Sequence, residues 1–303
     1  MTNERRSFLQ LLAAGVGLAA LTKAGAMEPA MTDHPAHDMS MFPAKWTGNE
    51  QIAMLLYPGF TALDLVGPHF MLTGLIGAKV HLVGKTREPV VSDTGLGIVP
   101  TLTMAKCPKN LDIVFTPGGS EGTLKAMRAN AYVDWLADRG SRARLVASVC
   151  TGSLLLGQAG LLRGKRATSH WVARDLLPLF GATPVNERVV WDGNVVTGAG
   201  VSAGLDLGIS VVARLRDAEY AQTMQLLAEY APQLQFQSGT PESATPQVSE
   251  RTARMFDGLR EQFSLTSKQA RGECWQQPIS VPRRRLKCQR TDRNVGRDSS
   301  RAA

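Results

Sequence analysis

Short apolar segments alternate with longer helix-like segments through most of the chain. The apolar segments are brief and rich in β-branched residues, which is typical of strands buried on both faces. They are predicted at 52–57, 80–83, 111–115 and 145–149. Helical patterns are predicted at 60–76, 123–138, 171–180, 205–215 and 218–230. Such an alternation favours a mostly parallel central sheet with helices on both faces, so the sequence predicts a three-layer α/β/α sandwich.

Two hairpins are predicted beside the parallel strands. A glycine-bearing turn at 92–97 separates two short apolar pairs, and Asp192-Gly193 lies between two apolar segments. Asp-Gly between such segments is a strong signal for a tight hairpin turn. We find no helix-turn-helix pattern after residue 263 and therefore expect no DNA-binding module there.

The first 26 residues have the pattern of an export signal. Arg5-Arg6 lies in a twin-arginine sequence, an apolar run follows at 11–21, and Ala24-Gly25-Ala26 resembles a cleavage site. The run is too short for a stable membrane anchor. We expect residues 1–26 to be removed during export to the periplasm by the twin-arginine route, and 27–49 to form a flexible leader. An uncleaved amphipathic helix is the alternative.

Positive charge is concentrated at the two ends. Residues 264–303 hold ten Lys or Arg and three acidic residues, which gives +7 of the formal net charge of +8. Residues 1–26 contribute +2, so 27–263 sum to about −1. A body without a basic field is not expected to bind nucleic acid, despite a pI near 9.6. We expect an α/β domain at 50–235, a helical extension at 236–263, and a polar, disordered tail beyond.

The four cysteines do not form a metal motif. Cys107, Cys150, Cys274 and Cys288 lack the close spacing of zinc ligands, so no metal site is predicted. An oxidising compartment permits disulfides but does not imply them. Cys107, between Lys106 and Pro108, is interpreted as a loop residue.

Cys150 falls where an apolar strand gives way to a helix start. The segment 145–149 suits a buried strand, and Thr151-Gly152-Ser153 supplies small hydroxyl residues suited to a helix N-terminus. At such an elbow the turn presents the side chain, and the helix amides stabilise an anion and lower a thiol pKa. The alternative is a buried structural thiol, because free cysteine is among the most buried residue types.

Four motifs resemble a known family in their order and spacing. They are 60–68 with Asp64, Pro117-Gly118-Gly119, 148–157 around Cys150, and 162–171 with His170. Each motif is weak alone. Together, over about residues 50–235, they resemble the ThiJ/PfpI superfamily, the class I glutamine amidotransferase-like group with a flavodoxin-like fold. Within it the chain is most similar to the isonitrile hydratases.

The resemblance implies catalytic roles for three residues. Cys150 matches the family nucleophile, Thr151 matches the following residue that is also implicated in catalysis, and Asp64 matches the acid beside the thiol. Two adjacent anions repel in a low-dielectric pocket, so we expect the pKa of Asp64 to rise. The alternative for Asp64 is a simple cap of the turn that follows it.

The resemblance also implies groups that bind substrate or an oxyanion. Gly118 and Gly119, with the amide of Thr151, match backbone donors that polarise a bound atom, and His170 matches an auxiliary histidine near the pocket. The two glycines could instead serve turn geometry, and His170 could be structural. The stretch 198–204 resembles the family's loop and helix start near the site, or it serves close helix packing.

Taken together, the resemblance implies a cysteine enzyme without cofactor or metal. The expected reaction is hydration of a small-molecule isonitrile to an N-substituted formamide through a Cys150 thioimidate, by a homodimer. One alternative is another cysteine reaction of the superfamily, glyoxalase-like or aldehyde-adduct hydrolysis. Another is a non-catalytic periplasmic ligand-binding domain.

Overall fold

The computed structural model describes residues 42–274 of the 303-residue chain. The predicted export signal, most of the predicted leader, and the end of the predicted tail lie outside the described residues. Within 42–274, no helix has the length and apolar character needed to cross a membrane.

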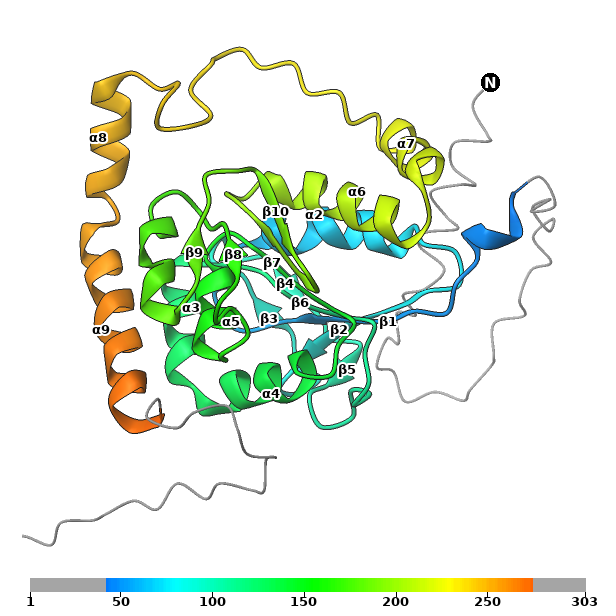
Figure 1. Cartoon of the computed structure of the whole chain (residues 1–303), viewed down its shortest axis with the longest axis horizontal. Coiled ribbons are helices and arrows are strands. Elements are labelled where there is room, and N and C mark those ends of the chain that lie inside the picture. The colour runs from blue at the N-terminus through cyan, green and yellow to red at the C-terminus, as the bar shows by residue number, and fades with distance from the viewer. Residues whose placement is uncertain (1–41, 275–303) are drawn as a thin grey trace, which may run out of the picture.

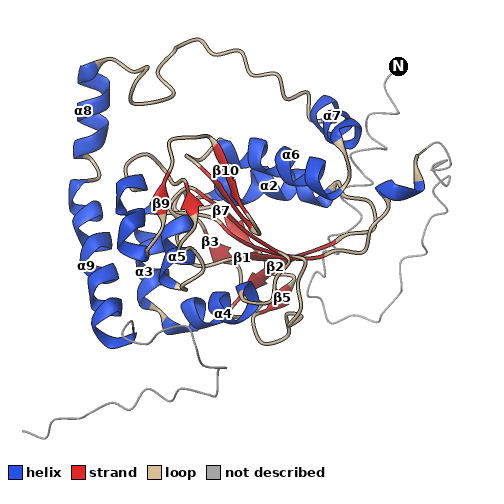
Figure 2. Ribbon diagram, viewed as in Figure 1, coloured by secondary structure: helices blue, strands red, loops and turns tan. Residues whose placement is uncertain are grey.

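A seven-stranded sheet forms the centre of the fold (Figure 2). Its strands are β1 (Gln51–Leu55), β2 (Lys79–Gly84), β5 (Leu102–Thr103), β6 (Ile113–Thr116), β7 (Leu145–Val149), β10 (Val189–Asp192) and β11 (Val195–Gly198). The spatial order is β10-β11-β7-β6-β1-β2-β5, and every neighbouring pair is parallel except β10 with β11. The inner strands β6 and β7 are buried at every position, as their continuous apolar sequences predict.

Small strand pairs accompany the sheet. They are β3 (Val90–Val91) with β4 (Gly97–Ile98), and β8 (Arg166–Ala167) with β9 (Thr183–Pro184). The antiparallel pairs β3–β4 and β10–β11 are the two hairpins predicted around 92–97 and Asp192-Gly193.

Helices cover both faces of the sheet (Figure 1). On one face lie α2 (Ala62–Thr73), α6 (Ala203–Leu215) and α7 (Ala218–Leu227), and on the other lie α3 (Ser120–Arg128), α4 (Asn130–Gly140) and α5 (Gly152–Gln158). The mostly parallel three-layer sandwich expected from the sequence is therefore confirmed, and its topology is flavodoxin-like.

Close contact between α2 and α6 fixes the helix that carries Asp64. A Cβ added at Gly204 would lie 2.9 Å from the Pro68 side chain, and one added at Gly208 would lie 2.7 Å from Met71 Cβ. These distances are shorter than van der Waals contact, so glycine at both positions lets α6 approach α2. The close-packing interpretation of the 198–204 stretch thus holds for Gly204.

Two predicted helices differ in the structure. The predicted helix at 123–138 is split into α3 and α4, because Ala129 is extended with φ −98° and ψ 100°. In place of a helix at 171–180 there is the 3-10 helix η2 (Arg174–Phe180), which contains Pro178. Proline lacks an amide donor and disfavours a helical residue before it, which accounts for the irregular segment.

The predicted leader is partly packed where the structure describes it. The 3-10 helix η1 (Ala44–Trp46) buries Trp46, whose ring meets Tyr220 edge-on with centroids 4.8 Å apart. Trp46 Nε1 also donates to Asp217 Oδ2 at 3.0 Å. The end of the predicted flexible leader therefore packs against the domain through a large aromatic side chain.

The C-terminal segment is also more ordered than its charge suggested. After a loop come α8 (Pro246–Arg254) and α9 (Asp257–Cys274), so helix continues past residue 264, where we expected a disordered tail to begin. Phe263 is 2% exposed, and Arg128 donates to Thr266 Oγ1 at 3.0 Å and to Gln262 Oε1 at 2.7 Å. Helix α9 lies along α3 and η2 (Figure 1). The contacts of Phe263 and Thr266 thus hold α9 against the domain, although the sequence of this helix is largely polar.

Candidate active site

The carboxyl ends of the parallel strands bring the predicted catalytic residues together. Cys150 follows β7, Gly118 follows β6, and Asp64 lies in the first turn of α2 after β1. Ligands of open parallel sheets bind outside this edge. The motifs that are far apart in the sequence therefore meet at one point of the fold.

Cys150 sits in a strained backbone conformation at the elbow. Its φ is +58°, which is uncommon for a residue other than glycine. Its amide donates to the carbonyls of Gly198 at 3.1 Å and Ala199 at 2.8 Å, and its carbonyl accepts from Ser153 Oγ and Ser169 Oγ. The surrounding loops thus hold the turn in place. The elbow predicted from the sequence is present, although the Cys150 residue is only 6% exposed.

Asp64 is fully buried and reaches across to the turn after β6. Its Oδ2 accepts a 2.9 Å hydrogen bond from the Gly118 amide, while Oδ1 has no N–H or O–H partner among the described residues. The thiol of Cys150 interacts with this carboxyl. Asp64 therefore does not act as a cap of its own helix, and one of its oxygens is left for the thiol or a bound molecule.

Burial raises the pKa of both acidic groups in the cluster. For Asp64 it raises the pKa to about 7, against the opposing effects of the Gly118 amide and the Cys150 thiol. The direction agrees with the expectation, but desolvation is the main cause. For Cys150, burial and the nearby Asp64 charge raise the pKa well above its usual value, although the Thr151 amide acts in the opposite direction. The expected lowering of the thiol pKa by the helix start is wrong, because burial outweighs it.

The backbone amides of the two glycines are occupied. Gly118 donates to Asp64, and Gly119 donates to Thr151 Oγ1 at 3.0 Å. The amide of Thr151 points to the Cys150 sulfur. We expected the Gly119 amide to polarise a bound atom, but here it orients the Thr151 hydroxyl instead. The Thr151 amide is the donor of this turn that faces the Cys150 sulfur.

Gly118 is also where the cluster has no room for a side chain. A Cβ there would lie 2.7 Å from Asp64 Oδ2, 2.7 Å from the Thr151 amide nitrogen and 2.8 Å from Cys150 Cβ. These three distances show that Asp64, Thr151 and Cys150 converge on one point. Glycine at 118 is required by this convergence.

His170 lines a cavity whose walls include neither Cys150 nor Asp64. The cavity measures about 630 Å³ and is lined in part by Leu63, which precedes Asp64, and by Ala199, whose carbonyl accepts from the Cys150 amide. His170 contacts the rings of Trp171 and Phe256, and burial lowers its pKa. Among the hydrogen bonds of the described residues, none joins His170 to Cys150 or Asp64. Its auxiliary role stays a prediction.

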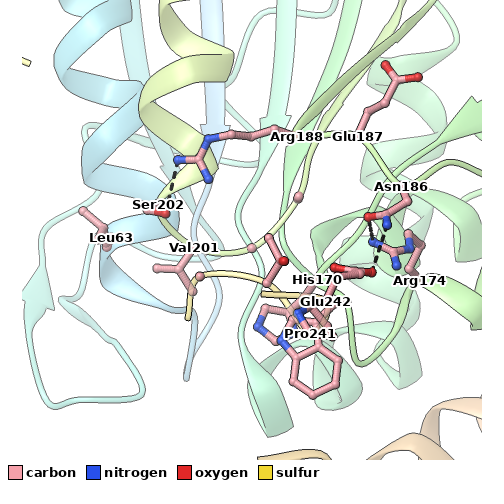
Figure 3. A pocket seen from close by; sticks show the side chains of 15 residues that line it. Leu63, His170, Arg174, Asn186, Glu187, Arg188, Val201, Ser202, Pro241 and Glu242 are labelled. Carbon is pink, nitrogen blue, oxygen red and sulfur yellow. Dashed lines mark hydrogen bonds between the residues drawn. The ribbon is translucent and has the colours of Figure 1, made fainter. Parts of the chain in front are cut away.

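The far wall of this cavity comes from a segment that the sequence did not connect to the site. Residues 239–242, before α8, line it, and Asn186 Nδ2 donates to Glu242 Oε1 at 3.1 Å. Figure 3 shows Arg174, Asn186 and Glu242 joined side by side at one end of the cavity, with His170 near them. Nothing in the local sequence of 239–242 indicates this position.

Two hydroxyl residues near Thr151 were missed by the sequence interpretation. Tyr57, at the end of the β1 segment, and Thr123, in α3, are both fully buried and hydrogen-bonded to each other, and Thr123 also bonds to Thr151. A lone tyrosine after a strand and a threonine in a helix carry no motif. Only the packing of α3 against this edge brings them together.

No cluster of three His, Cys, Asp or Glu side chains suited to a metal ion occurs within residues 42–274. In the same part of the chain Cys107 and Cys150 are free thiols. Cys107 lies in a loop, as expected, but is buried, and Arg139 donates to its carbonyl at 3.2 Å.

The chain is similar to known proteins both in sequence and in fold. The chain is 45% identical over 221 residues to isonitrile hydratase from Pseudomonas putida, covering 73% of this chain and 96% of that protein. A solved structure of a ThiJ/PfpI family protein from Pseudomonas syringae matches with a TM-score of 0.73 and 47% identity, over 80% of this chain and 99% of that one. A glutathione-independent glyoxalase from Caenorhabditis elegans is 25% identical over 180 residues, which are 58% of this chain and 94% of the glyoxalase.

The family model for DJ-1/PfpI proteins matches residues 50–214, a span that holds Asp64, the Gly118-Gly119 turn and Cys150. The sheet order, the elbow and this match agree, and the chain belongs to the DJ-1/PfpI family.

Proposed function

We propose that the protein is an isonitrile hydratase, which adds water to an isonitrile and releases an N-substituted formamide. The observation that carries the proposal is the buried Asp64 carboxyl, with one oxygen free of N–H and O–H partners, beside the buried Cys150 thiol. The 45% identity to the Pseudomonas putida hydratase over nearly its whole length supports the same reaction.

The first step joins sulfur to the isonitrile carbon. At neutral pH the Cys150 thiol is protonated, whereas Asp64, with a pKa of about 7, is ionised in about half of the molecules. The Asp64 carboxylate accepts the S–H proton as sulfur attacks the terminal carbon, and the proton passes to that carbon. The product is a thioimidate in which carbon carries sulfur, hydrogen and a double bond to nitrogen. A carboxyl group whose pKa is close to the surrounding pH is suited both to take this proton and to return it.

The second step adds water and restores the thiol. Asp64 takes one proton from water as the oxygen bonds to the thioimidate carbon, and that proton goes on to nitrogen. The C–S bond then breaks, the hydroxyl proton passes to sulfur, and the formamide leaves. The Thr151 amide next to sulfur stabilises negative charge as the bond breaks.

A second candidate is glyoxalase-like chemistry on a small aldehyde. It is favoured by the Caenorhabditis elegans relative, which is described as a glyoxalase. A buried thiol with an adjacent carboxyl also suits attack on a carbonyl carbon, so the catalytic groups alone do not separate the two substrates. A non-catalytic ligand-binding role is the third candidate, and it predicts no turnover of either substrate.

Purified protein assayed in parallel with cyclohexyl isocyanide and methylglyoxal distinguishes these candidates. We expect N-cyclohexylformamide from the first substrate and little or no lactate from the second. Cys150→Ala should abolish the reaction, while Cys107→Ala, at the other buried free cysteine, should retain it. Lactate without formamide would favour the glyoxalase, and no product from either would favour a binding domain. The homodimer implied by the resemblance is proposed as the active form, which gel filtration with light scattering tests.

A further inference from the structure

A chain of buried hydroxyl groups leads from Thr151 into the protein. Thr151 Oγ1 lies 2.9 Å from Thr123 Oγ1, which lies 3.0 Å from Tyr57 Oη, which donates to the Pro117 carbonyl at 2.6 Å. Tyr57 and Thr123 are fully buried, and Thr151 is 5% exposed. These three hydroxyl groups therefore do not readily exchange their hydrogen bonds with bulk water, and their partners are the buried groups around them.

A count of the available protons shows which hydroxyl group donates to which. A carbonyl only accepts, so the single Tyr57 hydroxyl proton is committed to Pro117. Tyr57 Oη can then only accept from Thr123, and Thr123, with its proton so used, can only accept from Thr151. If all three contacts are hydrogen bonds, Thr151 donates to Thr123, Thr123 donates to Tyr57, and Tyr57 donates to the Pro117 carbonyl.

The same count shows that Thr151 Oγ1 has a lone pair, and no proton, left on the side away from Thr123. Its proton has two inward acceptors, Thr123 Oγ1 and the Gly119 carbonyl at 3.0 Å. One of its two lone pairs accepts from the Gly119 amide. The remaining lone pair is left for the side of the residue that adjoins Cys150. The Cys150 sulfur competes with the two inward acceptors for the hydroxyl proton, because a hydrogen bond from Thr151 lowers the pKa of the thiol.

We propose that Thr123 and Tyr57 are positioning residues, which turn the Thr151 hydroxyl proton away from Cys150 so that its oxygen accepts a hydrogen bond from the attacking water. The Asp64 carboxylate then takes one water proton and the Thr151 oxygen binds the other. Neither Thr123 nor Tyr57 acts on the substrate itself. The water-orienting role rests on the proposed hydratase function, whereas the orientation of the hydroxyl does not.

The test uses two readouts that should move in opposite directions. In Thr123→Val the Thr151 hydroxyl loses one inward acceptor and donates more often to sulfur, which favours the thiolate. The iodoacetamide alkylation rate of Cys150 at about pH 8, followed by peptide mass spectrometry, should rise about threefold, as a thiol pKa lower by about half a unit requires. Formamide formation should fall about fivefold, since the water loses its acceptor and a hydrogen bond of ordinary strength is lost.

Three further variants separate this role from packing. Thr123→Ser keeps the hydroxyl and should restore both rates. Tyr57→Phe should change both rates in the same directions as Thr123→Val, because Thr123 then turns its proton to Thr151. Thr168→Val is the matched control: Thr168 is fully buried, and its hydroxyl has no partner among the described residues, so both rates should stay at the wild-type value.

An unchanged or slower alkylation rate in Thr123→Val would overturn the proposal, as would a failure of Thr123→Ser to restore it. If the wild-type protein hydrates no isonitrile, the proposed function fails, while the alkylation rates still decide the orientation of the Thr151 hydroxyl.

Discussion

The amide of Gly118 donates a 2.9 Å hydrogen bond to Asp64 Oδ2, although the two residues belong to connections that follow different strands. This bond ties the start of α2 to the turn after β6. It also decides which carboxyl oxygen is held by the backbone and which is left for chemistry.

Gly118→Ala should therefore reduce activity more than stability. The new methyl group would lie 2.7 Å from Asp64 Oδ2 and 2.8 Å from Cys150 Cβ, so the carboxyl must move away from the thiol. We expect formamide formation to fall at least about tenfold, because displacements near 1 Å at a reacting group have large effects. Gly258→Ala, where nothing lies within 4 Å of the added Cβ, is the matched control. Equal rates in the two variants would contradict the convergence at Gly118.

Asp64→Asn should change how stability depends on pH. The folded-state pKa of Asp64, about 7, is above its usual value of 3.8, so its contribution is fully present below about pH 4 and is lost as pH rises through 7. Asparagine does not titrate. The free energy of unfolding of Asp64→Asn, relative to wild type, should thus increase by on the order of 2 kcal/mol between about pH 5 and pH 8.

Urea denaturation at the two pH values measures this difference, and the same variant should lose most hydratase activity. A relative stability that does not change with pH would place the Asp64 pKa near its ordinary value.

The positive φ of Cys150 predicts an inverted order of stability for two small replacements. Alanine normally stabilises relative to glycine, but at φ +58° the order should reverse by about 1 kcal/mol, because glycine adopts this conformation without a Cβ clash. Thermal unfolding should give Cys150→Gly a higher melting temperature than Cys150→Ala. The opposite order would show that the elbow carries no strain.

The docking of α9 is tested by one buried and one exposed residue in the same helix. Phe263→Ala should destabilise the protein by about 3 kcal/mol, because it removes a side chain that is 2% exposed. Leu265→Ala, at a residue that is 45% exposed, should cost less than about 1 kcal/mol. Chemical denaturation of both variants provides the comparison, and similar losses would mean that α9 is not packed against the domain.

Export by the twin-arginine route is proposed from residues outside the described part of the chain. Replacing Arg5-Arg6 by Lys-Lys should leave the precursor in the cytoplasm, because the route recognises the arginine pair. Cell fractionation and immunoblotting give the readout. Processing at the wild-type rate would reject this interpretation.

Much of the fold was predictable because it is encoded by local patterns. The apolar run before Cys150 and the Asp192-Gly193 turn gave a buried strand and a hairpin, both confirmed. Where Ala129 divides two helices, the composition of the segment remains helical on both sides, and a break of one residue leaves almost no trace in the sequence.

The features that were missed depend on contacts between distant residues. The charge count around α9 says nothing of Phe263, whose burial depends on the surface beneath it. The helix start after Cys150 predicted a low thiol pKa, but burial and the Asp64 charge reverse it, and both are properties of the assembled site. Tyr57 and Thr123 likewise become partners of Thr151 only after α3 has packed.

The raised pKa of the buried Cys150 thiol has a consequence for the durability of the protein. Peroxides oxidise thiolates far faster than thiols, and susceptibility also rises with exposure. A cysteine that is 6% exposed and protonated at rest is protected on both counts. The proposed nucleophile is thereby less open to oxidation than an exposed thiol of low pKa, which is the opposite of what a peroxide sensor requires.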